Sequence, residues 1–251
     1  MALKAIEILK NKGYKGADGN WVDLTSAIDE DEALFLHNLV KKYNPQNSLE
    51  IGCAEGVSAI TICESLNNTA KHTILDPFQS TQWKNKGVNN LKAEGYTNFT
   101  LIEERSELAL PQLLKENRKF DFVFVDGWHT LDHVMVEFFY INRMLPVGGV
   151  VVFDDATLAG LNKLMRYISN YPNYICLGSA GHVELSLQRK TLNTAKRIIN
   201  GLFFFLPNRV KREMLNDTVV RSDEKLKITG TVVAFQKTAE DSRDWAWYEI
   251  F

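Results

Sequence analysis

The sequence predicts an α/β fold with a doubly wound, mostly parallel sheet. Short apolar runs alternate with helical stretches through the middle of the 251-residue chain, and a glycine turn directly follows the first of these runs. A last apolar run comes after a long helical stretch, which predicts an antiparallel strand at the edge of the sheet. Together these observations predict a Rossmann-like, seven-stranded sheet with helical additions at the N-terminus and before the last strand.

The N-terminal segment, residues 1–46, is predicted to be helical with one turn. Three glycines mark the turn, and the helix after it ends at Asn44-Pro45. Its apolar residues recur at one-face helical spacing: Leu36, Leu39, Val40 and Tyr43. Residues 47–251 are predicted to form the main domain, with a helical insertion at about 190–218.

The main domain is predicted element by element from its apolar pattern. Predicted strands are 48–51, 72–75, 99–102, 120–125, 150–153, 174–177 and 227–236. Predicted helices are 57–66, 83–93, 107–116, 131–145, 158–169 and a long stretch at 192–215. The run at 121–125 is almost wholly apolar, as expected for a strand buried on both faces.

Composition narrows the classes of protein. Hydrophobic residues make up 45% of the chain, enough for a core, and the net charge of −2 gives no global basic field for nucleic acid. The three cysteines, Cys53, Cys63 and Cys176, sit in apolar stretches and are expected to be free thiols in a reducing compartment. Without a secretory signal or membrane span, the expected location is the cytoplasm.

The glycine turn has the pattern Glu50-x-Gly52-x-x-x-Gly56. Ligands of open α/β sheets bind at the carboxyl ends of the strands, where Gly52 permits a tight turn and close approach. Gly56 opens the next helix, whose amides favour an anionic group. A dinucleotide fingerprint requires glycine where this chain has Ala54, which argues against a nicotinamide oxidoreductase. The plainer alternative is a turn that only packs.

Three residues after later strands are further candidates for cofactor contact. A carboxylate at Asp76, after the second strand, can accept hydrogen bonds from both ribose hydroxyls of a nucleotide-type cofactor, or it only forms an Asp-Pro turn. Phe78 lies against adenine or fills the core. Ser106 either caps a helix, in the pattern Ser106-Glu107, or contacts adenine.

Acidic residues end the fourth and fifth parallel strands, in FVDGWHT and FDDA. Asp126, Asp154 and Asp155 should therefore converge near His129, where a divalent cation such as Mg²⁺ would relieve their repulsion. Such a cation would hold a substrate hydroxyl, and His129 would take its proton. Alternatively, Asp126 and Asp155 cap helices, or Asp126 binds the cofactor alone. His133 is interpreted as an ordinary helix residue.

The motifs LEIGCAEG, LDPF, FVDGWHT and GGVVVFDDA resemble those of class I S-adenosylmethionine (SAM)-dependent methyltransferases. The resemblance is to the metal-dependent O-methyltransferase branch, which includes catechol, caffeoyl-CoA and macrocin-type sugar O-methyltransferases. It covers roughly residues 25–180 and returns at TGTVVAFQK.

The resemblance implies a role for each matching residue. It implies that His129 and Asp126 are catalytic, with His129 replacing the lysine of the catechol enzyme, and that Asp126, Asp154 and Asp155 hold the metal. Many relatives have asparagine where this chain has Asp155, and sugar-modifying relatives tolerate the aspartate. The implied cofactor residues are Glu50, Ile51, Gly52, Cys53, Glu55, Gly56, Ser58, Asp76, Pro77, Phe78, Ser106, Asp126, Gly127 and Trp128.

The expected activity is SAM-dependent O-methylation of a hydroxyl on a small molecule, such as a sugar, glycoconjugate or natural product, assisted by Mg²⁺ or another divalent cation. One alternative is a metal-independent methyltransferase, for which a nitrogen acceptor is open. Another is a non-catalytic subunit that binds SAM or a nucleotide as a sensor or in an assembly.

The insertion is predicted to be one amphipathic helix that Pro207 ends. Its apolar face comprises Leu192, Ala195, Ile199, Leu202, Phe203 and Leu206. Basic residues flank it, namely Lys196, Arg197, Arg209, Lys211 and Arg212. Packing on the domain or across a homodimer is favoured over contact with a membrane, and a lid over the acceptor site is a further alternative.

Overall fold

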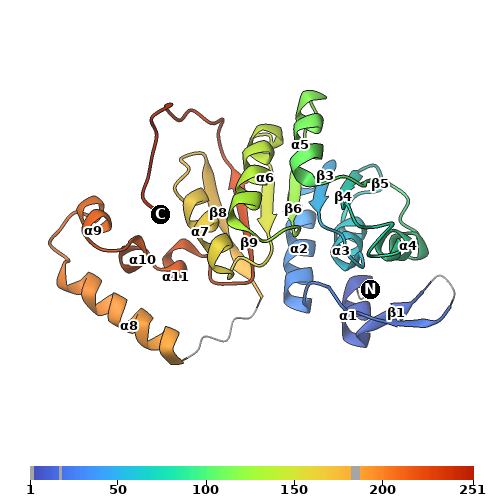
Figure 1. Cartoon of the computed structure of the whole chain (residues 1–251), viewed down its shortest axis with the longest axis horizontal. Coiled ribbons are helices and arrows are strands. Elements are labelled where there is room, and N and C mark those ends of the chain that lie inside the picture. The colour runs from blue at the N-terminus through green and yellow to red at the C-terminus, as the bar shows by residue number, and fades with distance from the viewer. Residues whose placement is uncertain (1–2, 17–18, 182–186) are drawn as a thin grey trace.

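The computed structural model describes residues 3–16, 19–181 and 187–251. Its centre is a seven-stranded sheet in the order β5-β4-β3-β6-β7-β9-β8, flanked by helices (Figure 1). The strands are β3 (Asn47–Ile51), β4 (Lys71–Leu75), β5 (Phe99–Ile102), β6 (Phe122–Val125), β7 (Val150–Phe153), β8 (Tyr174–Ala180) and β9 (Val232–Lys237). The predicted Rossmann-like fold is confirmed.

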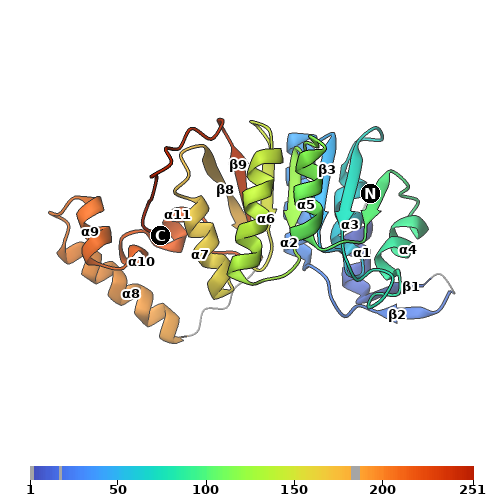
Figure 2. The ribbon, with the colours of Figure 1, turned by 45° about the horizontal axis from the view of Figure 1, so that its top comes forward.

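Helices cover both faces of the sheet because β6 and β7 are apolar on both sides. One face packs on α5 (Ser106–Lys115), α6 (Leu131–Met144) and α7 (Ala159–Ile168), which lie side by side in Figure 2. The other packs on α1 (Lys4–Asn11), α2 (Glu30–Tyr43), α3 (Val57–Ser65) and α4 (Lys86–Ala93). The strands β5, β4, β3, β6 and β7 are mutually parallel, so their carboxyl ends share one edge.

The antiparallel strand lies one place in from the edge. β9 pairs antiparallel with β7 on one side and with β8 on the other, so β8 forms the edge itself. β9 begins at Val232, whereas the sequence pattern predicted a start at Lys227. Lys227 has a left-handed backbone, with a φ of 62°, and caps the C-terminal end of the short helix α11 (Asp223–Leu226).

The N-terminal segment contains a hairpin in addition to its helices. β1 (Gly13–Lys15) pairs antiparallel with β2 (Trp21–Asp23), where the sequence predicted only a turn. Strands of three residues are too short to show a period of two, so the pattern could not reveal them. α2 begins with a reciprocal cap between Asp29 and Glu32 and ends, as predicted, before Asn44.

The insertion consists of several helices. The helical stretch predicted at 192–215 consists of two helices: α8 (Leu187–Leu202) ends before Pro207, and α9 (Asn208–Met214) begins after it. Pro207 has no amide hydrogen and disfavours helix in the residue before it, so it starts α9 and does not end α8. α10 (Asp217–Val220) follows. None of the helices in the described ranges is long and apolar enough to cross a membrane.

A buried arginine anchors the insertion to the sheet domain. The guanidinium of Arg166, on α7, pairs with Asp217 of α10 and lies 2.6 Å from Asp223 Oδ1 of α11. It also donates to the backbone oxygen of Arg221 at 2.7 Å. Because the side chain of Arg166 is fully buried, these acceptors offset the cost of removing its charge from water.

Candidate active site

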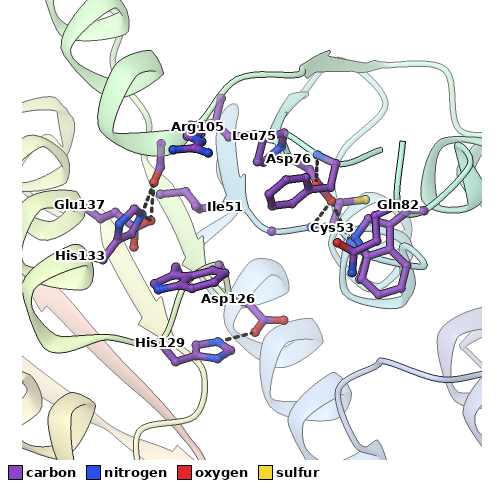
Figure 3. Close-up of a pocket in the computed structure, with 18 of the residues that line it drawn as sticks. Ile51, Cys53, Leu75, Asp76, Gln82, Arg105, Asp126, His129, His133 and Glu137 are labelled. Carbon is purple, nitrogen blue, oxygen red and sulfur yellow. Dashed lines mark hydrogen bonds and ion pairs between the residues drawn. The ribbon is translucent and has the colours of Figure 1, made fainter. Parts of the chain in front are cut away.

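A cavity of about 540 Å³ opens at the carboxyl ends of the parallel strands (Figure 3). Figure 3 shows Asp76 on one side of it, Glu137 and His133 on the opposite side, and Asp126 and His129 at a third position. Most of the expected cofactor residues line it: Ile51, Gly52, Cys53, Asp76, Pro77, Phe78, Ser106, Asp126, Gly127 and Trp128. Four others, Glu50, Glu55, Gly56 and Ser58, lie outside its lining.

The glycine turn holds β3 close to the neighbouring β6. Gly52 has a φ of 90°, and a Cβ at this position would overlap the backbone oxygen of Asp126. Gly56 has a φ of 84° and lies against the backbone of Gly87 in α4. Both positions therefore require glycine, Gly52 for the cavity wall and Gly56 for the packing of α3 on α4.

Glu50 lies beneath the turn and does not face the cavity. Its carboxylate accepts a hydrogen bond from Ser58 Oγ at 2.5 Å and lies 2.8 Å from His72 Nε2, and the side chain is fully buried. Glu50 lines neither cavity, so this arrangement leaves it no direct contact with a cofactor, whereas Ser58 lines the smaller, adjoining cavity described below. Glu50 and Ser58 support the turn from below. Ser58 and His72 supply the hydrogen-bonding partners that the buried carboxylate of Glu50 requires.

Glu55 turns toward the N-terminal segment. Its carboxylate accepts from the backbone amide of Thr25 at 2.8 Å and from Lys86 Nζ at 2.8 Å. The expected cofactor contact is therefore replaced by a bond that ties residues before α2 to the glycine turn. This tie places Ser26 on the cavity wall.

Asp76 is bonded mainly to the protein itself. Its Oδ2 accepts from the amides of Cys53 (3.2 Å) and Ala54 (3.0 Å) and from Gln79 Nε2 (2.8 Å). Its Oδ1 accepts from the amide of Phe78 at 2.9 Å. A carboxylate has about four acceptor positions spread over two oxygens, so Oδ1 keeps one position open at the cavity.

Ser106, His133 and Glu137 form a polar cluster on the wall opposite Asp76. Ser106 Oγ donates to Glu137 Oε1 at 2.6 Å and lies 2.9 Å from His133 Nε2. The N-cap of α5 is Arg105, so the expectation that Ser106 caps this helix is wrong. Glu137 is fully buried, and within the described structure its Oε2 has no hydrogen-bond partner.

A second, smaller cavity of about 190 Å³ adjoins the first and is lined by acids. The two share Ser26, Cys53, Ala54, Asp126 and His129. The smaller one adds three carboxyl side chains: Glu32, Asp154 and Asp155. Asp126, Asp154, Asp155 and His129 thus meet at one place, as the strand order predicted.

His129 bridges two of these acids. Its Nε2 lies 3.4 Å from Asp126 Oδ1, and its Nδ1 lies 3.3 Å from Asp155 Oδ2. Asp126 and, to a smaller extent, Asp155 raise the pKa of His129, against the opposing effect of burial. The ring is thereby held where it can exchange a proton with a group in either cavity.

The acid cluster carries more negative charge than its surroundings compensate. Burial, followed by the nearby Asp126 and Glu32, raises the pKa of Asp154 to about 9. Removal from water also raises the pKa of Asp126 to about 6, although His129 opposes the shift. The pKa of Glu32 is raised, again by burial first. A positive group placed among them would reverse these shifts.

The donor set matches a hard divalent cation in chemistry, because all three expected metal ligands are carboxylates. In the described ranges, however, no three His, Cys, Asp or Glu side chains are arranged as a ligand set. Asp154 Oδ1 accepts from the amide of Asp155 at 2.7 Å. Binding of a metal would therefore require the side chains of Asp126, Asp154 and Asp155 to change their orientation. The metal site stays a prediction.

The pKa of Asp154 leads to a pH-dependent stability. In the unfolded chain an aspartate has a pKa of about 3.9. Between that pH and about 9, Asp154 is therefore protonated in the folded state only. The free energy of unfolding consequently falls as the pH rises through this range. Without divalent cations, we expect the free energy of unfolding to fall by up to about 1.4 kcal/mol per pH unit between pH 6 and 8. Denaturant titrations should show a flatter dependence for Asp154→Asn. The control Asp31→Asn, at an exposed position in α2, should keep the wild-type slope. Equal slopes in the wild type and in both variants would contradict the raised pKa of Asp154.

Sequence reasoning missed two acids of this site. Glu32 reaches the smaller cavity from α2, and Glu137 reaches the larger one from α6. The pattern Asp29-x-x-Glu32 signals a helix start, but not that this end of the helix contacts Thr231, just before β9, and lines the smaller cavity. His133, interpreted as an ordinary helix residue, lines the larger cavity, and Glu137 raises its pKa.

Part of this chain is similar in sequence to known proteins. Residues 49–156 match a family described as a methyltransferase domain. Tapetum-specific methyltransferase 1 of Arabidopsis thaliana is 33% identical over 135 residues, which cover 53% of this chain and 56% of that protein. Caffeoyl-CoA O-methyltransferase 1 of Eucalyptus globulus is 26% identical over 165 residues, covering 60% and 64%. The chain thus matches less than two thirds of either plant protein.

Solved structures share the fold. The O-methyltransferase TomG of Streptomyces achromogenes, in complex with SAM, gives a TM-score of 0.54 at 20% identity, covering 60% of this chain and 73% of that one. An O-methyltransferase of Bacillus cereus, in complex with SAH, gives 0.54 at 19%, covering 61% and 75%. Residues 49–156, which contain the glycine turn and Asp126, Asp154 and Asp155, thus match a methyltransferase domain, and the chain shares its fold with solved O-methyltransferases.

Proposed function

We propose that this protein transfers the methyl group of SAM to a hydroxyl of a small molecule. The observation that carries the proposal is the pair of adjoining cavities that share Asp126 and His129. The larger cavity has the size and lining of a cofactor site, and the smaller one holds the titratable groups. Acceptor and cofactor would therefore meet where His129 lies.

The walls of the larger cavity suggest how SAM would lie. The anionic end of the methionine part would face the turn at Gly52 and the start of α3, and the open position of Asp76 Oδ1 would accept from a ribose hydroxyl. Adenine would reach the opposite wall, where Glu137 Oε2 is free to accept from its amino group. Phe78 and Trp128 offer apolar surface on the way.

His129 would act as the general base. SAM, when bound, would supply the methyl group and leave as the neutral thioether, and a ring nitrogen of His129 would take the proton of the acceptor hydroxyl. Asp126 and Asp155 stabilise the imidazolium that results. A divalent cation held by Asp126, Asp154 and Asp155 would supply Lewis acidity toward the acceptor hydroxyl.

Calorimetric titration with SAM, with Mg²⁺ or with EDTA, tests the cofactor first. Saturable binding is expected in both conditions, followed by turnover on hydroxylated acceptors when Mg²⁺ is present. A stabilising shift of the unfolding temperature by Mg²⁺, absent in Asp154→Asn, would show metal binding without reference to activity. Absence of SAM binding would overturn the proposal.

Two other outcomes would favour a different function for this protein. Turnover that EDTA does not change would favour a metal-independent methyltransferase. SAM binding with no turnover on any acceptor would favour a non-catalytic role. Both alternatives share the cofactor site and differ only at the acid cluster.

Glu137 is expected to determine selectivity for the purine. Its carboxylate only accepts hydrogen bonds, so it favours the amino group of adenine over the carbonyl of hypoxanthine. We expect Glu137→Gln, whose amide also donates, to reduce the preference for S-adenosylhomocysteine over S-inosylhomocysteine by about tenfold. Calorimetry with the two ligands measures this. The control Glu107→Gln alters the other carboxylate of this cavity that lies beside His133 and should keep the wild-type ratio. An unchanged ratio in Glu137→Gln would contradict the contact between Glu137 and the purine.

A further inference from the structure

The helix α8 is turned with its apolar side toward solvent. Its half-buried residues, Asn193, Lys196 and Asn200, recur at helical spacing and are all polar. Its main packing partner among the elements is α10, and Lys211 Nζ lies 3.4 Å from Asn200 Oδ1. An amphipathic helix of a globular domain normally buries its apolar side and exposes its polar side. The expected packing of the apolar face on this domain is therefore wrong.

The exposed side of α8 is a continuous apolar stripe. Leu192, Ala195, Ile199 and Leu202 follow one another at spacings of three and four residues, with Ile198 beside them. Ile198 is 61% exposed and Leu202 is 67% exposed. Phe204 and Phe205, just beyond the helix, extend the stripe, and Phe204 is 81% exposed. We call these residues the apolar stripe of α8.

The same region is strongly basic. Residues 187–214 contain seven lysines and arginines and a single acid, Glu213, although the whole chain has a net charge of −2. Within α8 itself the sequence has no acidic residue. Lys196 and Arg197 lie on the side of the helix away from the centre of the apolar stripe. An apolar stripe bordered by basic residues is the pattern of helices that lie in the surface of a membrane.

We propose that the apolar stripe of α8 docks on an anionic lipid surface. In this arrangement the stripe enters the boundary between headgroups and acyl chains, while Lys196 and Arg209 reach the lipid phosphates and Arg197 stays paired with Glu224 of α11 at 2.7 Å. Figures 1 and 2 both show α8 at the outer end of the molecule, away from the central strands, with α9 and α10 beside it. A flat surface can therefore reach the stripe without meeting the sheet domain.

The charge also favours lipid over a second copy of the chain. A twofold interface through the stripe would bring the same basic region from each copy face to face. In each copy Arg197 already pairs with Glu224, and α8 itself has no acid that could pair with Lys196 of the other copy. Nucleic acid would use the basic residues but would leave the exposed isoleucine, leucine and phenylalanine side chains in water. An anionic bilayer uses both features at once.

Cosedimentation of the full chain with vesicles tests this. We expect binding to vesicles of phosphatidylcholine with phosphatidylserine, little binding to phosphatidylcholine alone, and weaker binding as salt is raised. Ile198→Ser/Leu202→Ser and Phe204→Ser/Phe205→Ser should each weaken binding at least about tenfold. Lys196→Gln/Arg209→Gln should weaken binding to the anionic vesicles only.

The matched control is Leu108→Ser/Val147→Ser, which removes two exposed apolar residues far from the insertion in sequence and should bind like wild type. Circular dichroism and the unfolding temperature show whether each variant is folded. No binding to anionic vesicles, or equal binding to neutral ones, would overturn the proposal. So would a dimer, detected by light scattering, that the stripe variants convert to monomer. The test does not use SAM, so it stands apart from the proposed methyl transfer.

Discussion

Replacement of His129 by glutamine is expected to lower the rate constant for methyl transfer by about 10²–10⁴-fold, the usual contribution of a positioned general base. Glutamine keeps a polar side chain of similar reach but cannot take up the proton. SAM affinity should change little, because the ring lies with Asp126 at the acid end of the cavity, apart from the walls of Asp76 and of Glu137 (Figure 3). Single-turnover kinetics and calorimetry on one preparation separate the two effects.

The control for His129 is His133→Gln, which alters the other histidine of the same cavity. Because His133 contacts Ser106 and Glu137, this variant should weaken SAM binding more than it slows transfer. The wild-type rate should also rise with pH through a pKa above the usual histidine value, since only the neutral ring accepts a proton and Asp126 raises its pKa. A His129→Gln enzyme with the wild-type rate would exclude it as the base.

Replacement of Gly52 by alanine is expected to abolish SAM binding and to destabilise the fold by about 1–3 kcal/mol or more. Two costs add at this position. An L-residue at a φ of 90° is strained, and the new Cβ overlaps the backbone oxygen of Asp126. The turn must therefore move away from β6, and the shared wall of the cavity moves with it.

Gly148→Ala separates the two costs. Gly148 has nearly the same φ, 91°, but a Cβ there meets nothing within 4 Å. This control should show the backbone strain alone and keep SAM binding. Chemical denaturation and calorimetry of both variants measure the difference. If Gly52→Ala were no less stable than Gly148→Ala and still bound SAM, the close contact between the turn and β6 would not matter for the site.

The two cavities are linked through the N-terminal segment. Glu55 holds Thr25 beside the turn, and Glu32 accepts from Thr231 next to β9 while its carboxyl lines the smaller cavity. The residues before the sheet thus cover the acid cluster. In the proposed enzyme, this cover would exclude water from the acceptor and strengthen the electrostatic interactions of Asp126 and Asp154.

The sequence by itself determined the order and position of the sheet elements. The runs at 99–102 and 150–153 became β5 and β7 with the predicted bounds. β7 is buried on both faces and is therefore apolar throughout. It also determined that Asp126, Asp154 and Asp155 meet, since the carboxyl ends of parallel strands share one edge. These features depend on local pattern and on the geometry of parallel sheets.

Only the tertiary structure decided which way the side chains of these motifs turn. Glu50 and Glu55 belong to the glycine motif, yet one pairs with His72 beneath the turn and the other with Lys86 beside it. Glu137 joins the site from a different helix, and α8 turns its apolar stripe outward although the pattern suits burial. The direction of a side chain and the face that a helix buries depend on residues far away in the chain. The local periodicity of the sequence carries no information about these distant contacts.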